Sequence, residues 1–315
     1  MASNTKPALR FIGCDVGKRE IVAFDTRTER TRTVPNTADA LAAFAGELDD
    51  TCLVVCEATG GYERLLLAAL LAAGRAVHRA DARKVKAFIR SFGILGKSDG
   101  IDARALARYG AERHHQLVRW RMPQQQRARL QALVGARSDL VGQRVALNNR
   151  LQAPGADLVA HHLEPLLQCF DQQIAALEAE IDQLIAAEPE LARAAGTLRE
   201  ISGIGPRTAA ALLALMPELG ALTGKQAAAL AGLAPHPRQS GASDASRPTR
   251  GGRPEVKRAL FLAAMSAAKH NPKLKAFYER LIANGKKRLV ALVAVMRKLI
   301  VIGNARLRPV TDSAT

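Results

Sequence analysis

The sequence predicts an α/β N-terminal domain, a long helical hairpin or coiled-coil linker, and a mostly α-helical C-terminal domain. Short β-branched runs alternate with helical patterns in the first third, whereas the middle is dominated by Gln, Arg, Leu and Ala and the last third by Ala and Leu. A chain of 315 residues is also long for a single core. We place the three domains at residues 8–115, 116–190 and 191–307.

The N-terminal elements follow one another in a recognisable order. Two β-runs, Phe11–Cys14 and Glu20–Phe24, flank a Gly-containing turn and predict a hairpin, which Thr31–Val34 could extend. Thr37 then predicts the N-cap of a helix. The remaining elements are a buried strand ending at Glu57, a helix over Tyr62–Ala73, a short strand at Ala76–Arg79 and a helix from about Ala82. This β-β-β-α-β-α-β-α order predicts a mixed sheet.

The segment from Gln124 to about Ala187 predicts two long helices. In its first half a three-four spacing links Leu130, Leu133, Arg137, Leu140, Arg144, Leu147 and Leu151. After a break at Pro154-Gly155 the spacing returns in Phe170, Ile174, Leu177, Ile181 and Leu184. The pattern is typical of an antiparallel helical hairpin, and equally of a coiled-coil arm that pairs between subunits.

Two breaks interrupt the helical C-terminal third. A polar loop rich in Gly, Ser, Pro and Arg runs from Pro235 to Pro254, and a long loop without secondary structure inside a compact domain indicates function or disorder. The string ISGIGPRTA at 201–209 is typical of a helix-hairpin-helix, in which Gly203 and Gly205 leave backbone N–H groups facing a phosphate. The alternative is an ordinary tight turn.

Charge indicates a polyanionic partner. Lys and Arg number 46 against 29 Asp and Glu, which gives a formal net charge of +17. The cations run through the whole chain instead of forming one basic amphipathic helix, so nucleic acid, including duplex DNA, fits better than a membrane surface. Only 4% of residues are aromatic, so stacking on Trp120, Tyr62 or Tyr109 is not expected to be the main mode of recognition.

The composition also bears on the compartment. The four cysteines form no CxxC pair, and no signal-peptide pattern opens the chain, so neither disulfides nor structural zinc are expected. The longest apolar run, Leu65 to Ala73, falls well short of the roughly 20 residues that span a bilayer. We expect a cytoplasmic protein that associates with the nucleoid and contacts no membrane.

Four acids stand where strands end or a helix begins. Asp15 follows the first strand, Glu57 ends the buried strand, and Asp99 and Asp102 share one face of a helix. If they converge they repel, so the cluster requires cations, and oxygen ligands without His or Cys favour Mg²⁺ or Mn²⁺. Two such ions can promote phosphodiester displacement. Taken singly, each acid could instead close a turn or cap a helix.

Three strings in the first domain resemble the Piv/MooV-type insertion-sequence transposases. They are IGCDVGKREIVAFD, CEATGGYERL and KSDGIDARALARYG. The resemblance continues in the C-terminal third through ISGIGPRTAAALLALMPELGAL, LAGLAPHPRQSG and RPTRGGRPEVKRALFLAA, so that it covers nearly the whole chain. It implies a RuvC-like (RNase H-like) N-terminal domain, with Asp15, Glu57, Asp99 and Asp102 as its DEDD acids.

The resemblance also implies a serine nucleophile and a guide. The Ser-Gly of RQSG places the serine at Ser240, although the same loop offers Ser243, Ser246 and Thr249. Cations nearby would bind nucleic-acid phosphate: Arg247, Arg250, Arg253 and Lys257. Members of the family are guided by a structured bridge RNA from the element's noncoding end, and we expect a homodimer or higher homo-oligomer.

Three other functions stay open at this point. A metal-dependent, structure-selective DNA nuclease of the junction-resolvase type would use the same acids with water and leave the serine loop idle. A sugar kinase or similar phosphotransferase could also begin with a strand and Asp-x-Gly, but no second phosphate loop or adenosine segment accompanies it here. A non-enzymatic nucleic-acid-binding protein remains if the acids do not converge.

Overall fold

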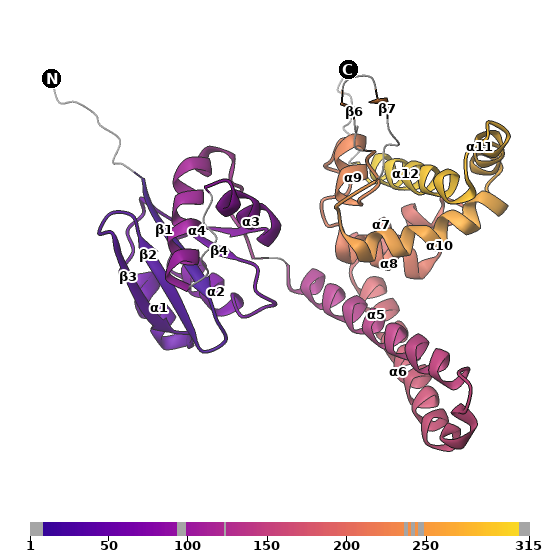
Figure 1. Ribbon diagram of the computed structural model, residues 1–315, viewed down its shortest axis with the longest axis horizontal. Helices are drawn as coiled ribbons and strands as arrows, with labels where there is room; N and C mark the ends of the chain where they lie inside the picture. Colours follow the sequence, from indigo (N-terminus) through magenta and orange to yellow (C-terminus); the bar gives the residue numbers. More distant parts are fainter. Residues whose placement is uncertain are drawn as a thin grey trace. The chain divides into compact units, whose positions relative to one another are not determined.

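The computed structural model describes residues 9–92, 99–122, 124–235, 239–240, 243–244 and 249–308, without the side chains of 99–101, 239–240 and 243–244. The chain folds as two compact units, Met1–Met122 and Pro123–Thr315 (Figure 1). Residues 116–122, which we assigned to the linker, lie with the first unit, where the Trp120 backbone N–H donates to the Val77 carbonyl at 2.7 Å.

A five-stranded mixed sheet forms the first unit, in the order β3-β2-β1-β4-β5. Strands β1, β2 and β3 pair antiparallel, whereas β4 lies parallel to both β1 and β5. The strands are β1 Arg10–Val16, β2 Glu20–Asp25, β3 Arg30–Pro35, β4 Cys52–Glu57 and β5 Ala76–Ala80. The predicted RuvC-like (RNase H-like) fold class is confirmed, and β4 is apolar throughout because it lies inside the sheet.

Helices cover both faces of this sheet (Figure 1). Alternate β1 residues such as Ile12 and Cys14 pack with α1 and α2, whereas Phe11 packs with α3 and α4 on the other face. The helices are α1 Ala38–Gly46, α2 Arg64–Ala72, α3 Ala82–Arg90 and α4 Asp99–Arg113, followed by the 3-10 turn η1, His114–Gln116. Asp15 and Glu57 therefore belong to the face that α3 and α4 cover.

Two glycines allow α4 to approach the sheet closely. A Cβ placed on Gly13 in β1 would lie 2.0 Å from the Ala103 carbonyl oxygen and 2.3 Å from the Ala107 nitrogen. A Cβ on Gly110 in α4 would lie 2.8 Å from the Val55 side chain. At Gly13 backbone thus packs against backbone, and at Gly110 the helix backbone packs against the Val55 side chain, so the two contacts fix the position of α4 on β1 and β4.

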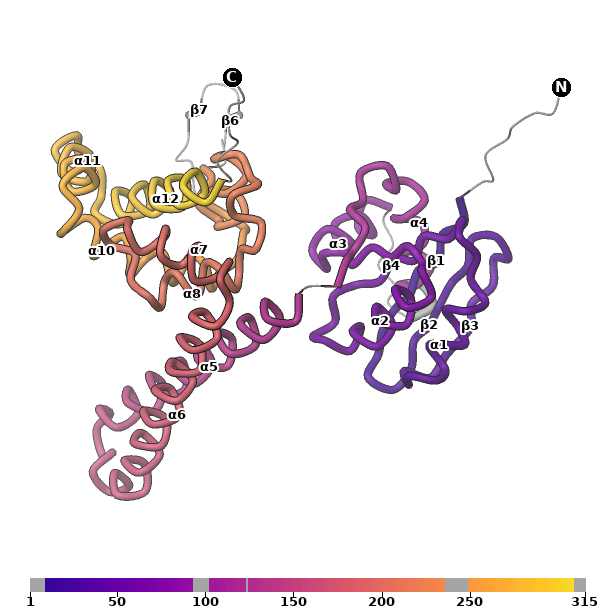
Figure 2. Tube along the Cα trace, turned by 180° about the vertical axis from the view of Figure 1, so that it is seen from behind, coloured from indigo at the N-terminus to yellow at the C-terminus, as the bar shows by residue number. Residues whose placement is uncertain are grey.

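The second unit begins with the predicted hairpin. Helices α5, Gln125–Leu151, and α6, Ala160–Ala187, pack antiparallel and are joined through the 3-10 turn η2, Ala156–Leu158 (Figures 1 and 2). Gly155 begins that turn with a positive φ of 81°. Four members of the predicted apolar series are buried: Leu130, Ile174, Ile181 and Leu184. Three others are only half-buried, because two helices alone cannot enclose a core: Leu140, Leu147 and Leu151.

The remaining helices form one core with the base of this hairpin. They are α7 Pro189–Arg199, α8 Pro206–Leu215, α9 Gly224–Leu230, α10 Pro254–His270, α11 Pro272–Ala283 and α12 Arg288–Arg306. The Pro235–Pro254 loop differs from the expected structureless segment, because it contains two-residue strands, β6 Gln239–Ser240 and β7 Ser243–Asp244, that pair antiparallel. Among the described helices, none has the combined length and apolar character needed to cross a membrane.

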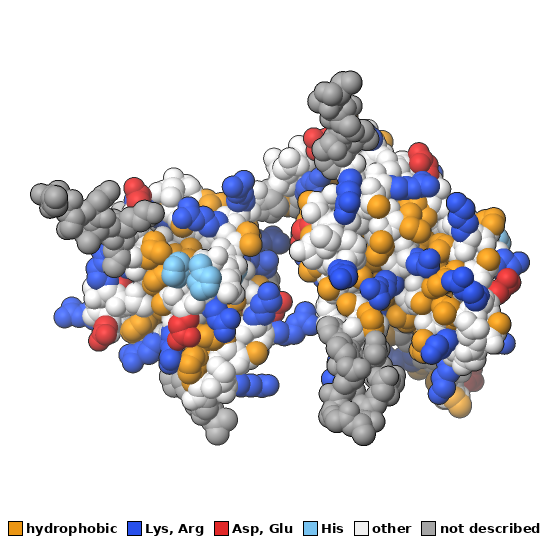
Figure 3. All heavy atoms as spheres, turned by 90° about the horizontal axis from the view of Figure 1, so that it is seen from above, with side chains coloured by type: hydrophobic (Ala, Val, Ile, Leu, Met, Phe, Trp, Pro, Cys, Tyr) orange, Lys and Arg blue, Asp and Glu red, His pale blue; other side chains and the backbone are white. Residues whose placement is uncertain are grey.

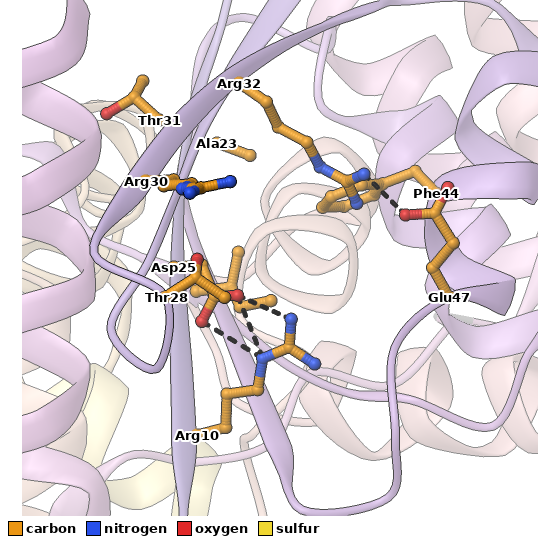
Figure 4. Close-up of a pocket in the computed structure, with 10 residues that line it drawn as sticks. Arg10, Ala23, Asp25, Thr28, Arg30, Thr31, Arg32, Phe44 and Glu47 are labelled. Atoms are coloured by element: carbon orange, nitrogen blue, oxygen red, sulfur yellow. Dashed lines mark hydrogen bonds and ion pairs between the residues drawn. The ribbon is translucent and has the colours of Figure 1, made fainter.

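An ion-pair cluster stabilises the sheet at the end opposite the acids (Figure 4). Arg10 donates to Asp25 at 2.6 Å across β1 and β2, and Arg32 lies over the Phe44 ring while donating to Glu47 at 2.5 Å. Burial is the largest single influence and would raise the pKa of Asp25, but the hydrogen bonds from Arg10, the Arg27 backbone and Thr28, together with the charge of Arg10, hold this pKa below its ordinary value. These residues line a cavity of about 280 Å³, and because its two acids, Asp25 and Glu47, are both paired with arginines, we assign it a structural role.

Candidate active site

Strand register places Asp15 beside Glu57. The parallel strands β1 and β4 pair Cys14 with Cys56, and each acid is the next residue along its strand. Both side chains are half-buried. Carboxyl ends of neighbouring parallel strands meet at one sheet edge, so the first two predicted ligands lie together where solvent can reach them.

Helix α4 brings the third acid to the same edge. Asp102 is half-buried and directly precedes Ala103, whose carbonyl packs against Gly13, two residues before Asp15. Asp99 begins α4, and helical geometry puts it on the same face as Asp102, but its side chain lies outside the described part of the structure. Among the described side chains, no three Asp, Glu, His or Cys form a metal site by themselves.

The chemistry of these donors suits a hard divalent cation. Asp15, Glu57 and Asp102 offer only carboxylate oxygens, which Mg²⁺ and Mn²⁺ accept and zinc does not favour. A hollow of about 330 Å³ opens beside Asp15, and the exposed Lys18 and Arg19 line it. Cations at the rim of an acidic site can hold a phosphate that the carboxylates alone would repel.

A buried glutamate organises the loop that follows Glu57. Glu63 is 1% exposed, and its Oε2 accepts hydrogen bonds from the backbone N–H groups of Gly61 at 2.9 Å and Thr59 at 3.2 Å. Its Oε1 accepts from Arg79 of β5, with the shortest contact at 2.6 Å. Burial is the largest single influence and would raise the pKa of Glu63. The hydrogen bonds from its own backbone N–H, from Arg79 and from the Gly61 backbone, together with the charge of Arg79, nevertheless hold the pKa below its ordinary value.

A second side chain connects the loops that follow the two acid-bearing strands. The Asn36 amide nitrogen donates to the Gly17 carbonyl at 2.9 Å and to the Tyr62 carbonyl at 3.1 Å. Gly17 lies two residues after Asp15, and Tyr62 lies in the loop after Glu57. Asn36 and Glu63 therefore hold the two predicted ligands at a fixed separation through the backbone.

Sequence reasoning missed these supporting residues. A glycine inside a strand signals close backbone approach, so Gly13 could have been found from that rule. Glu63 could not, because a glutamate at the start of a helix is ordinarily an exposed residue. Its burial depends on Arg79, which is 16 residues away in the chain.

The structure describes only the backbone of the predicted nucleophile. Ser240 lies in β6, opposite Ser243 in β7, and its side chain is not described. Arg247 and Ser246 lie outside the described residues. Further along the same loop, Thr249 pairs with Pro235 as an isolated bridge.

Several contacts close the base of this loop. A Cβ on Gly232 would lie 2.3 Å from the Gly251 carbonyl oxygen, so these backbones touch. Arg253 donates to both carboxylate oxygens of Glu218, at 2.6 and 2.8 Å, and to the Leu215 carbonyl, a structural role that the sequence did not indicate. Two further residues that we predicted to bind phosphate lie nearby. Lys257 donates to Thr249 Oγ1 at 3.2 Å, and Arg250 is exposed.

The two glycines of the predicted helix-hairpin-helix differ in environment. Gly203 has a φ of 108°, and a Cβ there would lie 2.5 Å from the Ala267 side chain, so this glycine serves packing against α10. Gly205 is exposed, with nothing near its Cβ position, and it forms the N-cap of α8 without a side-chain cap. Because Pro206 has no N–H, the backbone N–H groups of Arg207 and Thr208 are the first that α8 offers, and no side chain of Gly205 caps them.

Comparison with known proteins identifies relatives for both units. Residues 12–154 match a family model of DEDD transposases of the IS110 type, which is described as a transposase. Residues 195–279 match a second model, described as transposase IS116/IS110/IS902 family. The pilin gene-inverting proteins of Moraxella lacunata and Moraxella bovis are each 31% identical over 262 residues, covering 82% of this chain and 80% of theirs. A solved structure of T. thermophilus RuvC in complex with a Holliday junction substrate is also similar, with 17% sequence identity and a TM-score of 0.28. The match covers 36% of this chain and 99% of the RuvC chain.

Proposed function

The chain belongs to the IS116/IS110/IS902 family of transposases, and we propose that it cuts and rejoins DNA strands with divalent cations held by Asp15, Glu57, Asp99 and Asp102. What supports this proposal is the β1–β4 register, which puts Asp15 next to Glu57, and the Gly13–α4 contact, which brings the end of α4 that carries Asp102 toward β1. When bound, Mg²⁺ or Mn²⁺ would neutralise these acids and polarise the phosphate under attack.

Side chains of the protein would position the metal ligands and the DNA strand at this edge. Asn36 and Glu63 keep the acid-bearing loops in place, so that the ligands need not reorganise when the cation binds. Lys18 and Arg19 would orient the strand through its phosphates. Because four carboxylates would repel one another without a cation, we expect cleavage to depend on added Mg²⁺ or Mn²⁺ and to stop in excess EDTA.

We further propose that Ser240 is the nucleophile. As its Oγ forms a bond to phosphorus, the bridging P–O bond of the strand breaks and the serine proton passes to a base or to water. The leaving sugar oxygen takes up a proton and becomes a free hydroxyl end, while the other part of the strand stays attached to the serine until it is rejoined. The Oγ of a serine needs activation, and a metal-polarised phosphate supplies it. The pairing of β6 with β7 supports this role, because it gives the backbone of Ser240 a defined register opposite Ser243.

A covalent adduct tests the serine. Protein incubated with cognate DNA and Mg²⁺ should yield a protein–DNA band on denaturing gels that is lost in Ser240→Ala and kept in the matched control Ser243→Ala. Free 3′-hydroxyl ends without any adduct, unchanged in Ser240→Ala, would support the alternative of a water-using, structure-selective nuclease. That alternative has one observation in its favour, since all four acids lie in a single compact unit.

We propose duplex DNA and a structured guide RNA as partners. Figure 3 shows Lys and Arg side chains over the visible face of each unit and far fewer acidic ones, in keeping with the net charge of +17. The uncapped N-terminus of α8 at Gly205 would contact one phosphate. The pilin gene-inverting relatives are named for inverting a gene, which is a recombination of DNA.

The hairpin arm is the surface that we propose for pairing between subunits. Apolar side chains near its tip are exposed, including Leu158 at 76%, Val145 at 51% and Leu166 at 50%. These residues belong to η2, α5 and α6 of the same arm, and exposed apolar surface on one part of a protein is typical of an interface. Light scattering should give a dimer or higher oligomer that dissociates when Leu158 and Leu166 are both changed to Ser.

A further inference from the structure

A third hollow of the first unit lies between α3, α4 and the edge strand β5, apart from the cavity at Arg10 and the hollow at Asp15. Its volume is about 610 Å³, within the range of roughly 300–1,000 Å³ usual for small-molecule sites. Its lining combines apolar and aromatic side chains with cations and neutral polar groups: His78, Arg79, Asp81, Lys84, Ala87, Phe88, Ser91, Tyr109, Arg113, Gln116, Leu117 and Val118. We refer to it as the edge pocket.

Three rings form the apolar side of the edge pocket. His78 lies against Tyr109 with their planes inclined by 30°, and Phe88 meets Tyr109 edge to face with ring centroids 5.2 Å apart. His78 Nδ1 lies 2.8 Å from the Val118 carbonyl oxygen, which only accepts, so Nδ1 carries the proton in this bond. In the neutral ring Nε2 is then an acceptor, and the half-buried imidazole is held in one orientation.

The rim of the edge pocket is cationic. Lys84 and Arg113 are both exposed, and neither forms an ion pair with any carboxylate that the structure describes. Asp81 is the one acid in the lining, and its carboxylate accepts from the Arg83 backbone N–H as the cap of α3. The outer face of α3 continues the positive charge beyond the pocket through the exposed Arg83, Lys86 and Arg90.

We propose that the edge pocket binds one unpaired nucleotide of a single-stranded nucleic acid. A phosphate ion would contact the cations but not the rings, whereas a nucleotide would contact both. Its base would lie against His78 and Tyr109, and its phosphate would bind Lys84 and Arg113. A base inside a duplex is covered on both faces by its neighbours and cannot enter such a pocket. The positive face of α3 extends past the pocket and suits a continuing strand better than a free nucleotide.

Helix α4 links the edge pocket to the acidic edge. Tyr109 follows Asp102 by seven residues, which is two turns on the same helical face and about 10 Å along the axis. A strand whose phosphate lies at the carboxylates could therefore place a nearby unpaired base in the pocket. This inference rests on the proposed function only because both require nucleic acid as the ligand. Binding is measured in EDTA, where cleavage does not occur, so a failure of the pocket to bind can be distinguished from a failure of cleavage.

Photocrosslinking with the full chain tests the site. Single-stranded RNA and DNA pentamers that carry one central thiolated pyrimidine are irradiated with the protein in EDTA, and the crosslinked peptides are mapped by mass spectrometry. We expect crosslinks within residues 78–118, reduced at least about 5-fold in His78→Ala and kept in His78→Phe, because stacking on a base contributes roughly 1–3 kcal/mol. Stronger crosslinking of RNA would identify a guide as the source, and stronger crosslinking of DNA a displaced strand.

Surface variants keep the test independent of folding. Removing two phosphate contacts with Lys84→Ala and Arg113→Ala should flatten the log–log dependence of pentamer affinity on salt by about 1.4. The matched control pair, Arg30→Ala with Lys225→Ala, removes two exposed cations elsewhere and should leave the crosslink within residues 78–118 unchanged. Crosslinks only outside residues 78–118, or equal yields with a fully paired duplex carrying the same thiolated base, would overturn the proposal.

Discussion

Substituting Gly13 with Ala should separate helix α4 from strand β1 and disable the acidic edge. The new Cβ would lie 2.0 Å from the Ala103 carbonyl oxygen and 2.3 Å from the Ala107 nitrogen, whereas real Cβ contacts are essentially never under 3.0 Å. Helix α4 must therefore move outward by at least about 1 Å, because both obstacles are backbone atoms that cannot rotate away.

The size of the effect follows from that displacement. Overpacking of this kind costs about 3 kcal/mol, which lowers the melting temperature of a unit of this size by roughly 10 °C. Asp102 precedes Ala103 and moves with it, and a misplacement of about 1 Å can reduce a reaction rate by roughly 100-fold. DNA cleavage should consequently fall further than stability alone explains, even at temperatures where the variant is folded.

Differential scanning calorimetry and a cleavage assay with Mg²⁺ measure the two effects. Gly46→Ala is the matched control, since nothing lies within 4 Å of its Cβ position in α1, and helix propensity predicts unchanged or slightly higher stability. If Gly13→Ala melts and cuts like the wild-type protein, then α4 is not fixed by this contact and the placement of Asp102 beside Asp15 is wrong.

Three further outcomes can be checked. Alanine at Asp15, Glu57, Asp99 or Asp102 should abolish cleavage with the fold intact by circular dichroism, and normal cutting by any three of these variants in Mg²⁺ would exclude a shared metal site. In the folded protein the pKa values of Asp25 and Glu63 lie below their ordinary 3.8 and 4.5. Each carboxylate therefore stabilises the fold fully above its ordinary pKa, and this contribution is lost as the pH falls through the lower pKa of the folded state. Asp25→Asn combined with Glu63→Gln should flatten the acid limb of a stability-against-pH curve, and an unchanged acid limb would mean that these ion pairs contribute nothing. Duplex DNA affinity should fall with salt at a log–log slope near −7 if about 8 phosphates are contacted, whereas a slope shallower than about −2 would mean that the charge forms no binding surface.

Local patterns were sufficient for the order of elements and for the positions of Asp15 and Glu57 along their strands. The hairpin, the buried strand ending at Glu57 and the break at Pro154-Gly155 are all visible in short windows, because side-chain periodicity and turn chemistry act between near neighbours. The position of Asp15 and Glu57 at strand ends came from the same windows. The sequence by itself therefore determined the fold class and which residues could be metal ligands.

Tertiary structure alone decided how those residues are supported. Burial of Glu63 requires Arg79 on another strand, and Arg253 is fixed by Glu218, 35 residues earlier in the chain. The edge pocket likewise exists only because β5, α3 and α4 meet, and its stacking pair, His78 and Tyr109, is 31 residues apart. Such contacts depend on register and packing between distant segments, and no local periodicity encodes which charged or aromatic side chain will meet which partner.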